Sequence, residues 1–310
     1  MMRQSDSDIV VVDPRKHDLK AIYAFYQTKA ERHTPFVVLR EPEFFETYRD
    51  AVMLVHRQED VNGLLIGSLT TDKAYLSFCL GADDVRRRLI ERFETLVRES
   101  GLTSIWIHFF NPILTAWWVK PGVTHPMYQG VELDGVDHRF YASLGYRDHS
   151  MQETYYRTLS DWVPSDAITA RLEQERANGL VVCISDATHR DALMVFANEV
   201  GHPGWQRAIL DHLDHPFVIA LAGERVVGFA GPLWVEPTGR GYFAGIGVLE
   251  RYRGHGLGKG LFQMLLWWHQ EHGASYMTLF TGRDNPAGRI YLEQGFEIVK
   301  RFMTLKKELK

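Results

Sequence analysis

The chain has 310 residues, of which 45% are hydrophobic and 12% aromatic, and this is enough apolar material for two globular cores. A net charge of −4 at pH 7 argues against nucleic acid or an anionic membrane as a general partner. No apolar run is long enough to span a bilayer, and residues 1–8 lack the apolar core of a signal peptide, so we expect a cytoplasmic protein.

The first half begins with the pattern of a strand followed by a helix. The apolar run at residues 9–12 predicts the strand, and Asp13 and Asp18 favour a helix after it. The two cysteines, Cys79 and Cys183, lie in apolar stretches without metal-ligand spacing, so we expect buried free thiols.

Residues 80–96 have the pattern of an amphipathic helix entered through a short turn. Four apolar residues share one helical face: Val85, Leu89, Phe93 and Leu96. We expect Asp83 and Asp84 to cap the free N–H groups of this helix. The basic run at residues 86–88 points around the helix rather than to one place, which favours a solvated face.

Residues 113–139 are rich in aromatic and turn-forming residues and predict a long loop. After them, residues 140–146 have an apolar-Tyr-x-x-x-Gly-aromatic pattern. Residues 159–165, which include a proline, are the predicted domain boundary. Residues 166–178 predict a short helix that Gly179 ends.

The second half repeats the first. A strand pattern returns at residues 180–184, and Asp186 and Asp191 follow it at the spacing of Asp13 and Asp18. The pattern of residues 140–146 returns at residues 290–296, but at a different separation. The first copy therefore carries an insertion near residues 113–139.

The run from Arg251 to Gly260 lies between an apolar strand pattern at residues 242–248 and a helix that Gly273 ends. Five apolar residues form one face of this helix: Leu257, Leu261, Met264, Leu265 and Trp268. Gly254 and Gly256 keep Cβ atoms out of the way, so backbone N–H groups can point at an anion above the positive end of the helix. This arrangement predicts a phosphate-binding loop.

Two better-known phosphate loops do not fit this run. The nucleotide P-loop requires a glycine and a Ser or Thr where this chain has Arg253 and Gly260. The dinucleotide fingerprint, started at Gly254, requires a small residue where Lys259 stands.

A second motif lies downstream. Asn285 as N-cap, Pro286 at the first helical position and Gly295 just past the end predict one short helix. Together with the R-x-x-G-x-G pattern of Arg251, Gly254 and Gly256, this motif resembles the GNAT superfamily of acyl-CoA-dependent N-acyltransferases.

The resemblance implies acetyl-CoA as cosubstrate. The pyrophosphate would lie on the backbone of residues 253–259, and the pantetheine arm would pair with residues 246–248. The implied cofactor-binding residues are Ile246, Gly247, Val248, Arg251, Arg253, Gly254, His255, Gly256, Leu257, Gly258, Lys259, Asn285 and Tyr291. Tyr291 would protonate the departing thiolate, and Asn285 would also face the thioester.

The general base is left open. Many relatives use a glutamate on the strand before the loop, where this chain has Ala244, Gly245 and Gly247. Glu250 is a candidate through water, and Glu199 and His202 lie in the segment that commonly borders the acceptor. An amine that is already neutral needs no strong base.

We expect an α/β (α+β) protein with two tandem GNAT-like domains, each a mixed, mostly antiparallel twisted sheet flanked by helices. Residues 1–160 would form a degenerate copy, and residues 166–310, with core 180–310, the acetyltransferase domain. The first copy lacks the cradle glycines and has Asp83 and Asp84 where phosphate would bind, so it should not bind coenzyme A well.

The predicted reaction is direct acetyl transfer to a primary amine of a small molecule or peptide, by a monomer or homodimer. One alternative is a non-catalytic CoA-binding sensor or structural protein, because the strand glutamate is missing. Another is transfer of a longer acyl group, for which Gly245 and Gly247 would leave space. Two histidine pairs stand a helical turn apart without a third ligand, so we expect solvent-facing histidines and no metal: His212 with His215, and His269 with His272.

Overall fold

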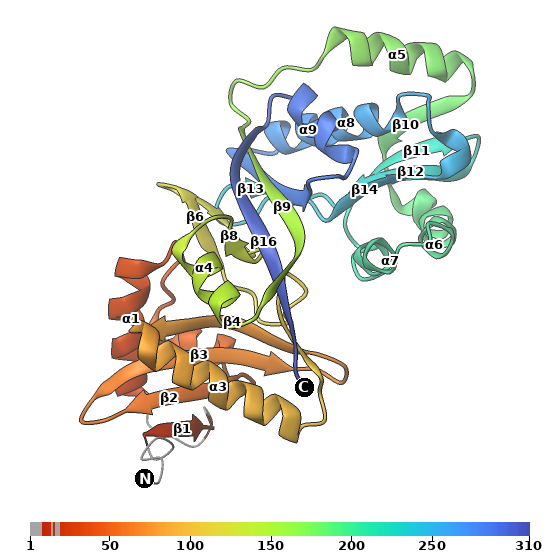
Figure 1. Cartoon of the computed structure of the whole chain (residues 1–310). Coiled ribbons are helices and arrows are strands. Elements are labelled where there is room, and N and C mark those ends of the chain that lie inside the picture. Colours follow the sequence, from red (N-terminus) through yellow and green to blue (C-terminus); the bar gives the residue numbers. More distant parts are fainter. Residues whose placement is uncertain (1–7, 14, 16–18) are drawn as a thin grey trace. The chain divides into compact units, whose positions relative to one another are not determined.

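The computed structural model describes residues 8–13, 15 and 19–310, and it divides into two compact units (Figure 1). Unit 1 contains the described residues up to Glu153 together with Lys300–Lys310, and unit 2 is Thr154–Val299. Asp18, which favoured a helix, and residues 1–7, which lack the pattern of a signal peptide, lie outside the described part of the chain.

Unit 1 is a twisted sheet with helices on both faces. Its elements are β1 (Ile9–Val12), α1 (Lys20–His33), α2 (Glu41–Thr47), β2 (Val52–Arg57), β3 (Val61–Leu69), β4 (Ala74–Gly81), α3 (Asp83–Glu99), β5 (Ser104–Ile107), β6 (Trp117–Lys120), β7 (Val123–His125), β8 (Val131–Glu132), α4 (Val136–Ser143) and the start of β9 (Arg147–Thr158). The strand order is β1-β2-β3-β4-β5-β16-β9, where β16 is Glu297–Glu308, and β1 to β4 are antiparallel neighbours. The predicted strand at residues 9–12 is therefore confirmed.

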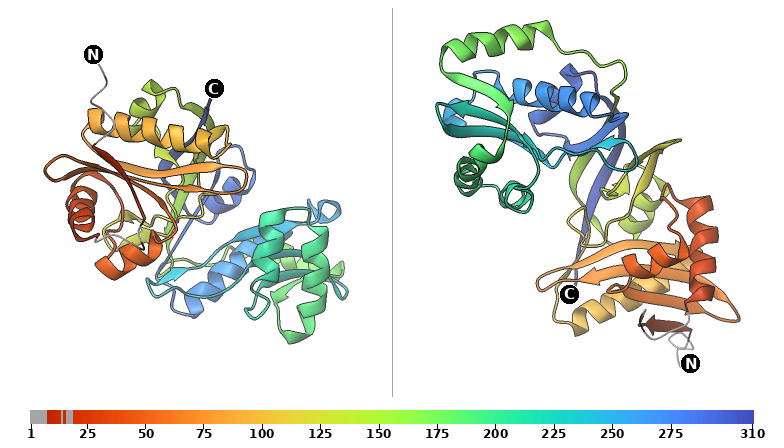
Figure 2. Two further views of the ribbon diagram at one scale, coloured as in Figure 1. Left: turned by 90° about the horizontal axis from the view of Figure 1, so that it is seen from below. Right: turned by 180° about the vertical axis from the view of Figure 1, so that it is seen from behind.

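Strand alternation gives unit 1 two apolar layers. On β2, the buried Leu54 belongs to the cluster with α3, whereas its neighbours Met53 and Val55 belong to the cluster with α1 and α2. Helix α3 accordingly covers one face of the sheet and α1 the other (Figures 1 and 2). The apolar face predicted for residues 85–96 is the face that α3 buries.

Unit 2 begins with an additional helix and then repeats much of this order of elements. They are α5 (Asp166–Ala177), β10 (Leu180–Ile184), the 3-10 turn η1 (Ala187–His189), α6 (Arg190–Glu199), α7 (Pro203–Leu210), β11 (Val218–Ala222), β12 (Arg225–Gly231), β13 (Arg240–Gly241), β14 (Gly245–Val248), η2 (Glu250–Tyr252), α8 (Leu257–Glu271), β15 (Tyr276–Gly282), α9 (Ala287–Glu293) and the start of β16 (Glu297–Glu308). Strands β10, β11, β12 and β14 form an antiparallel sheet, with α8 on one face and α6 and α7 on the other (Figure 1). The predicted helices at 166–178 and 257–268 are confirmed.

The two long strands β9 and β16 each belong to both units. Strand β9 starts in unit 1 and continues into unit 2 from Thr154, and β16 starts in unit 2 and continues into unit 1 from Lys300. In unit 1, Leu305 of β16 pairs with Ile107 of β5. In unit 2, β9 lies next to β15. Each unit thus obtains one strand of its sheet from the other repeat.

This exchange explains why the compact units differ from the domain limits read along the sequence. Limits near residues 160 and 166 follow the linear repeat, whereas the units change at Glu153 and again at Val299. The inserted segment near 113–139 contains the hairpin β6–β7 and strand β8 in unit 1. The prediction of one long loop was therefore wrong, because part of this segment forms strands.

The buried position of Arg86 contradicts the prediction that the basic run on α3 forms a solvated face. Its side chain is 8% exposed and donates to Asp137 at 2.6 Å and to Asp83 at 3.2 Å. The guanidinium also lies 3.9 Å from the ring centroid of Phe140. The reason is tertiary, because α4 supplies Phe140 over the first turns of α3.

The capping role predicted for two aspartates was also wrong. The N-cap residue of α3 is Ala82, which makes no side-chain cap hydrogen bond, and Asp83 accepts from Arg86 instead. Of the two free cysteines, Cys79 is buried as expected, and Cys183 is only half-buried. Burial raises the pKa of the Cys79 thiol to about 12, which makes it unreactive at neutral pH.

Candidate active site

The glycine loop of unit 2 has the geometry that its sequence predicts. Gly254 has φ +89° and Gly256 has φ +77°, values that favour glycine, and Gly256 is the N-cap of α8. The helical ladder begins with the bond from Gly260 N–H to the Gly256 carbonyl at 3.1 Å. The N–H groups of residues 257–259 precede this ladder, so they are available to an anion at the helix N-terminus.

The strand before the loop lies at the edge of its sheet. The predicted strand at residues 242–248 is shorter than expected, because only residues 245–248 form β14 and Arg240–Gly241 form the separate β13. β13 pairs in parallel with β15, whereas β14 pairs with β12 and ends the four-stranded sheet. The sheet that contains β13 and the sheet that contains β14 therefore separate after β13. Because β14 is the last strand of its sheet, its outer edge can form hydrogen bonds with an extended ligand arm.

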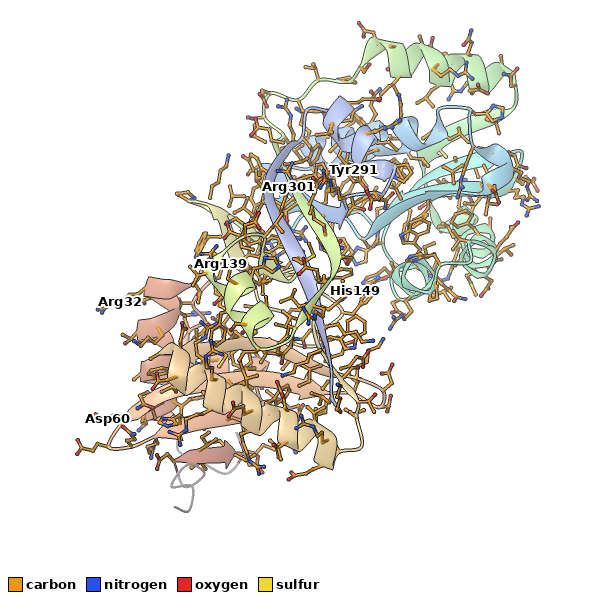
Figure 3. All side chains as sticks on the ribbon, viewed as in Figure 1. Arg32, Asp60, Arg139, His149, Tyr291 and Arg301 are labelled. Atoms are coloured by element: carbon orange, nitrogen blue, oxygen red, sulfur yellow. The ribbon has the colours of Figure 1, made fainter. Side chains whose placement is uncertain are left out.

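Tyr291 lies on α9 inside the packed interior of unit 2 (Figure 3). It is 3% exposed, and its ring centroid is 4.9 Å from that of Phe262 and 6.1 Å from that of Phe243. Burial raises the pKa of the phenol well above its usual value. The group therefore keeps its proton at neutral pH, and the higher pKa also makes it a weaker acid than a free phenol.

Tyr155 of β9 packs on Tyr291. Their ring centroids are 5.3 Å apart, and a Cβ placed on Gly288 would lie 2.7 Å from the Tyr155 hydroxyl oxygen. Nothing near Tyr155 in the sequence indicates this contact, because β9 reaches unit 2 from the first repeat. Gly288 in the second motif was the only local sign of a close approach.

Helix α9 begins one residue later than predicted. Pro286 occupies the N-cap position, and Asn285 accepts from the Ala287 N–H at 3.0 Å. Its side-chain amide donates to Thr281 at 2.8 Å. Gly295, with φ +78°, follows the helix end as expected.

Trp205 of α7 fills the space beside the two strand glycines. A Cβ on Gly245 would lie 2.5 Å from the indole Nε1, and one on Gly247 would lie 2.9 Å from Cζ3. No larger residue fits at either position without moving Trp205. Two glycines alternating on a buried strand were the sequence signal for this close approach.

The three candidate bases have different surroundings. Glu199 is held by Arg225 at 2.5 Å and by Arg251 at 3.3 Å. Glu250 is exposed at the start of η2. His202 is the N-cap of α7 and accepts from the Trp205 N–H at 3.2 Å.

The loop residues carry cationic side chains around the helix N-terminus. Arg251 pairs with Glu199, and Lys259 pairs with Glu293 at 2.7 Å. His255 lies between the two glycines and contacts Glu175 at 2.9 Å. With the positive-φ glycines and the free helix end, this part of unit 2 fits a diphosphate.

The histidine pairs do not form a metal site. Among the described residues, no group of three His, Cys, Asp or Glu side chains is placed to hold an ion. His212 and His215 pack on Trp234, with ring centroids 5.3 and 4.7 Å away. His269 is fully buried, contrary to the solvent-facing position expected for it.

Comparison with known proteins agrees with the geometry. Residues 186–296 match the model of the acetyltransferase (GNAT) family. The chain carries a GNAT-family acyltransferase domain. No curated protein sequence is close enough to count as a relative.

The solved structures that resemble the whole chain share its GNAT fold. A glucosamine N-acetyltransferase region of a fungal multi-domain GH3 β-N-acetylglucosaminidase is 16% identical with a TM-score of 0.71, and covers 96% of this chain. This chain spans only 38% of that protein. A GNAT protein from Sphaerobacter thermophilus is 13% identical with a TM-score of 0.63, over 97% of this chain and 96% of that one. A tandem GNAT protein from the clavulanic acid biosynthesis pathway is 14% identical with a TM-score of 0.61, over 97% and 98%.

The GNAT domain therefore lies in unit 2, and the whole chain has a tandem GNAT fold. Unit 1 also separates its strands, because β4 and β5 pair only at Ala74–Ile105 and Tyr75–Trp106. Its helix entry has Ala82 where unit 2 has Gly256. No helix in the described ranges is both long enough and apolar enough to cross a membrane.

Proposed function

We propose that this protein transfers an acetyl group from acetyl-CoA to a primary amine of a small molecule or peptide, with its site in residues 180–310. The main observation behind this proposal is that three features lie close together in unit 2. The open edge of β14 leads directly to a glycine-capped helix N-terminus, and the buried phenol of Tyr291 lies beside Phe243, just before that strand.

The reaction would be a direct transfer. The amine nitrogen forms a bond to the thioester carbonyl carbon, the carbon–sulfur bond breaks, and the amine loses one proton. Tyr291 would give a proton to the departing thiolate as the carbon–sulfur bond breaks. Residues 246–248 and 251–259, with Asn285, would bind and orient the cosubstrate.

The base is proposed to be Glu250, acting through water. Glu199 is already engaged by two guanidinium groups, which favours a role in holding Arg251. His202 has a structural task as the α7 N-cap, accepting from the backbone of Trp205. An amine supplied in neutral form would not depend on Glu250.

Acetyl is the proposed acyl group because the space beside Gly245 and Gly247 contains Trp205. That contact removes the reason for preferring a longer chain. An amino sugar is a sensible first acceptor, since the fungal structural neighbour is described as a glucosamine N-acetyltransferase region. A non-catalytic CoA sensor is the second candidate, because the strand lacks a glutamate.

The proposal is tested by calorimetry and by thiol release. We expect the protein to bind acetyl-CoA and to release free thiol faster when an amine panel is added. Tight binding with release at the buffer rate for every amine would favour the sensor, and no binding would refute both functions.

A glycine substitution tests the location of the cofactor site. Gly256→Asp places a carboxylate and a Cβ at the helix N-terminus, and should abolish the thermal stabilisation that CoA gives. Gly273→Asp is the matched control, because Gly273 also has positive φ and lies past the opposite end of α8. Equal loss of stabilisation in the two variants would contradict the site.

A further inference from the structure

Helix α5 precedes the residues that match the GNAT family and packs on the start of α8. Leu172 fills the space above Gly260, where a Cβ would lie 2.4 Å from its Cδ2. Gln263 of α8 accepts from the Ser165 N–H at 2.9 Å and donates to Thr169 at 3.1 Å. These contacts fix α5 against the turns of α8 that follow the glycine loop.

A buried carboxylate connects α5 to the loop itself. The Glu175 side chain is 2% exposed and contacts Arg171 at 2.5 Å and His255 at 2.9 Å. Burial opposes ionisation, but hydrogen bonds from His255 and Asn178 and the charge of Arg171 lower the pKa of Glu175 overall. The ionised carboxylate therefore holds the Arg171 guanidinium beside the loop.

Arg171 lies against the residue that starts α8. A Cβ on Gly256 would be 3.2 Å from Arg171 Cγ and 4.0 Å from its Nε. The Arg171 side chain is 48% exposed, so its charge is accessible at the edge of the cradle. Glu175 engages Nη2, and the remaining guanidinium N–H groups are oriented by that ion pair.

We propose that Arg171 is an additional ligand for the diphosphate of coenzyme A, supplied by a helix outside the GNAT-family match. This inference rests on the proposed function. A guanidinium binds phosphate through two parallel hydrogen bonds, and a charge placed beside a helix N-terminus adds to the attraction of the backbone N–H groups. Glu175 is the positioning residue for Arg171.

The test is isothermal titration calorimetry, which measures the dissociation constants of the full-length protein for coenzyme A and for 3′-dephospho-coenzyme A. Arg171→Gln should raise the dissociation constant about ten- to a hundredfold for both ligands. Arg171→Lys keeps the charge without the paired hydrogen bonds, and should recover part of the affinity. The control Arg176→Gln removes the same charge from an exposed position on the same helix and should change affinity less than threefold.

The outcomes separate this inference from the proposed function. If the wild-type protein binds coenzyme A and Arg171→Gln binds it equally well, the role of Arg171 is refuted while the function stands. If the loss occurs with coenzyme A but not with the 3′-dephospho form, Arg171 binds the 3′-phosphate, and its assignment to the diphosphate is wrong. If the wild-type protein does not bind coenzyme A, both proposals fail. Arg171→Lys supplies the comparison if Arg171→Gln does not fold.

Discussion

Tyr291 is a buried residue to which we assign a catalytic role. Its phenol is nearly enclosed by Tyr155, Phe262 and Phe243, which raises its pKa and also makes the ring part of the core. The ring therefore has a packing role in addition to the proposed catalytic one.

The variant Tyr291→Phe keeps the ring and removes the proton. We expect kcat to fall roughly ten- to a thousandfold, while the dissociation constant for acetyl-CoA changes by less than about threefold. Steady-state kinetics and calorimetry on the same preparation measure the two quantities. Unchanged turnover would remove Tyr291 from the mechanism.

His269 makes stability depend on pH. Burial lowers the pKa of this histidine to about 4 although its Nε2 lies 2.8 Å from the Tyr242 carbonyl oxygen. Between about pH 6.5 and pH 4, this histidine binds a proton in the unfolded chain, where its pKa is near 6.5, but not in the folded state. The free energy of unfolding is therefore fully retained above about pH 6.5 and falls as the pH drops toward 4, by about 3 kcal/mol in all.

The variant His269→Gln isolates this contribution, because glutamine can still donate to the carbonyl but does not titrate. Urea unfolding at pH 7 and pH 5 should show the wild-type protein losing about 2 kcal/mol more than the variant. A pH dependence that is the same in both proteins would show that His269 is not the responsible group.

At the scale of elements, α7 packs on β14 where the proposed function places the acyl group. Gly245 and Gly247 let the indole of Trp205 approach the strand, and Phe229 packs on Trp205 with ring centroids 5.8 Å apart. The helix and strand thus close a space that the sequence alone suggested was open.

The variant Trp205→Ala should reopen that space. We expect kcat/KM for a butyryl donor relative to acetyl-CoA to rise at least about tenfold, because the removed indole frees room for the longer chain. Trp267→Ala, which removes an indole that is 44% exposed on α8, is the control and should leave the ratio unchanged. An unaltered ratio in Trp205→Ala would place the acyl group elsewhere.

At the scale of the whole molecule, the duplicated chain exchanges strands between its repeats. The last strand, β16, completes the sheet of unit 1, where Phe302 is fully buried against Trp117 and Tyr128. A residue near the end of the chain therefore stabilises the unit formed mainly by the beginning of the chain.

Two phenylalanines in neighbouring parts of the sequence should accordingly destabilise different units. Phe302→Ala removes a large buried ring, at a cost of about 3 to 5 kcal/mol, and should reduce hydrogen-exchange protection in β2, β3 and β5. Phe296→Ala, whose ring contacts Tyr291 and Phe262, should reduce protection in α8 and α9 instead. Loss of protection in the same elements for both variants would contradict the strand exchange.

Local patterns in the sequence determined the elements and their order. Apolar periodicity predicted α3 and α8, the glycines at 254 and 256 predicted the loop, and the internal repeat predicted two similar units. These features depend on residues a few positions apart, which a single sequence displays directly. The same holds for the short helix α9 between Asn285 and Gly295.

Only the tertiary structure decided which distant residues meet. Arg86 is buried because α4 covers it, Tyr155 reaches Tyr291 because β9 crosses to unit 2, and Arg171 lies beside Gly256 because α5 packs on α8. Each of these contacts joins segments far apart in the chain, where no periodicity or spacing relates one residue to the other. Their energy comes from burial and ion pairing, which exist only once the elements have packed.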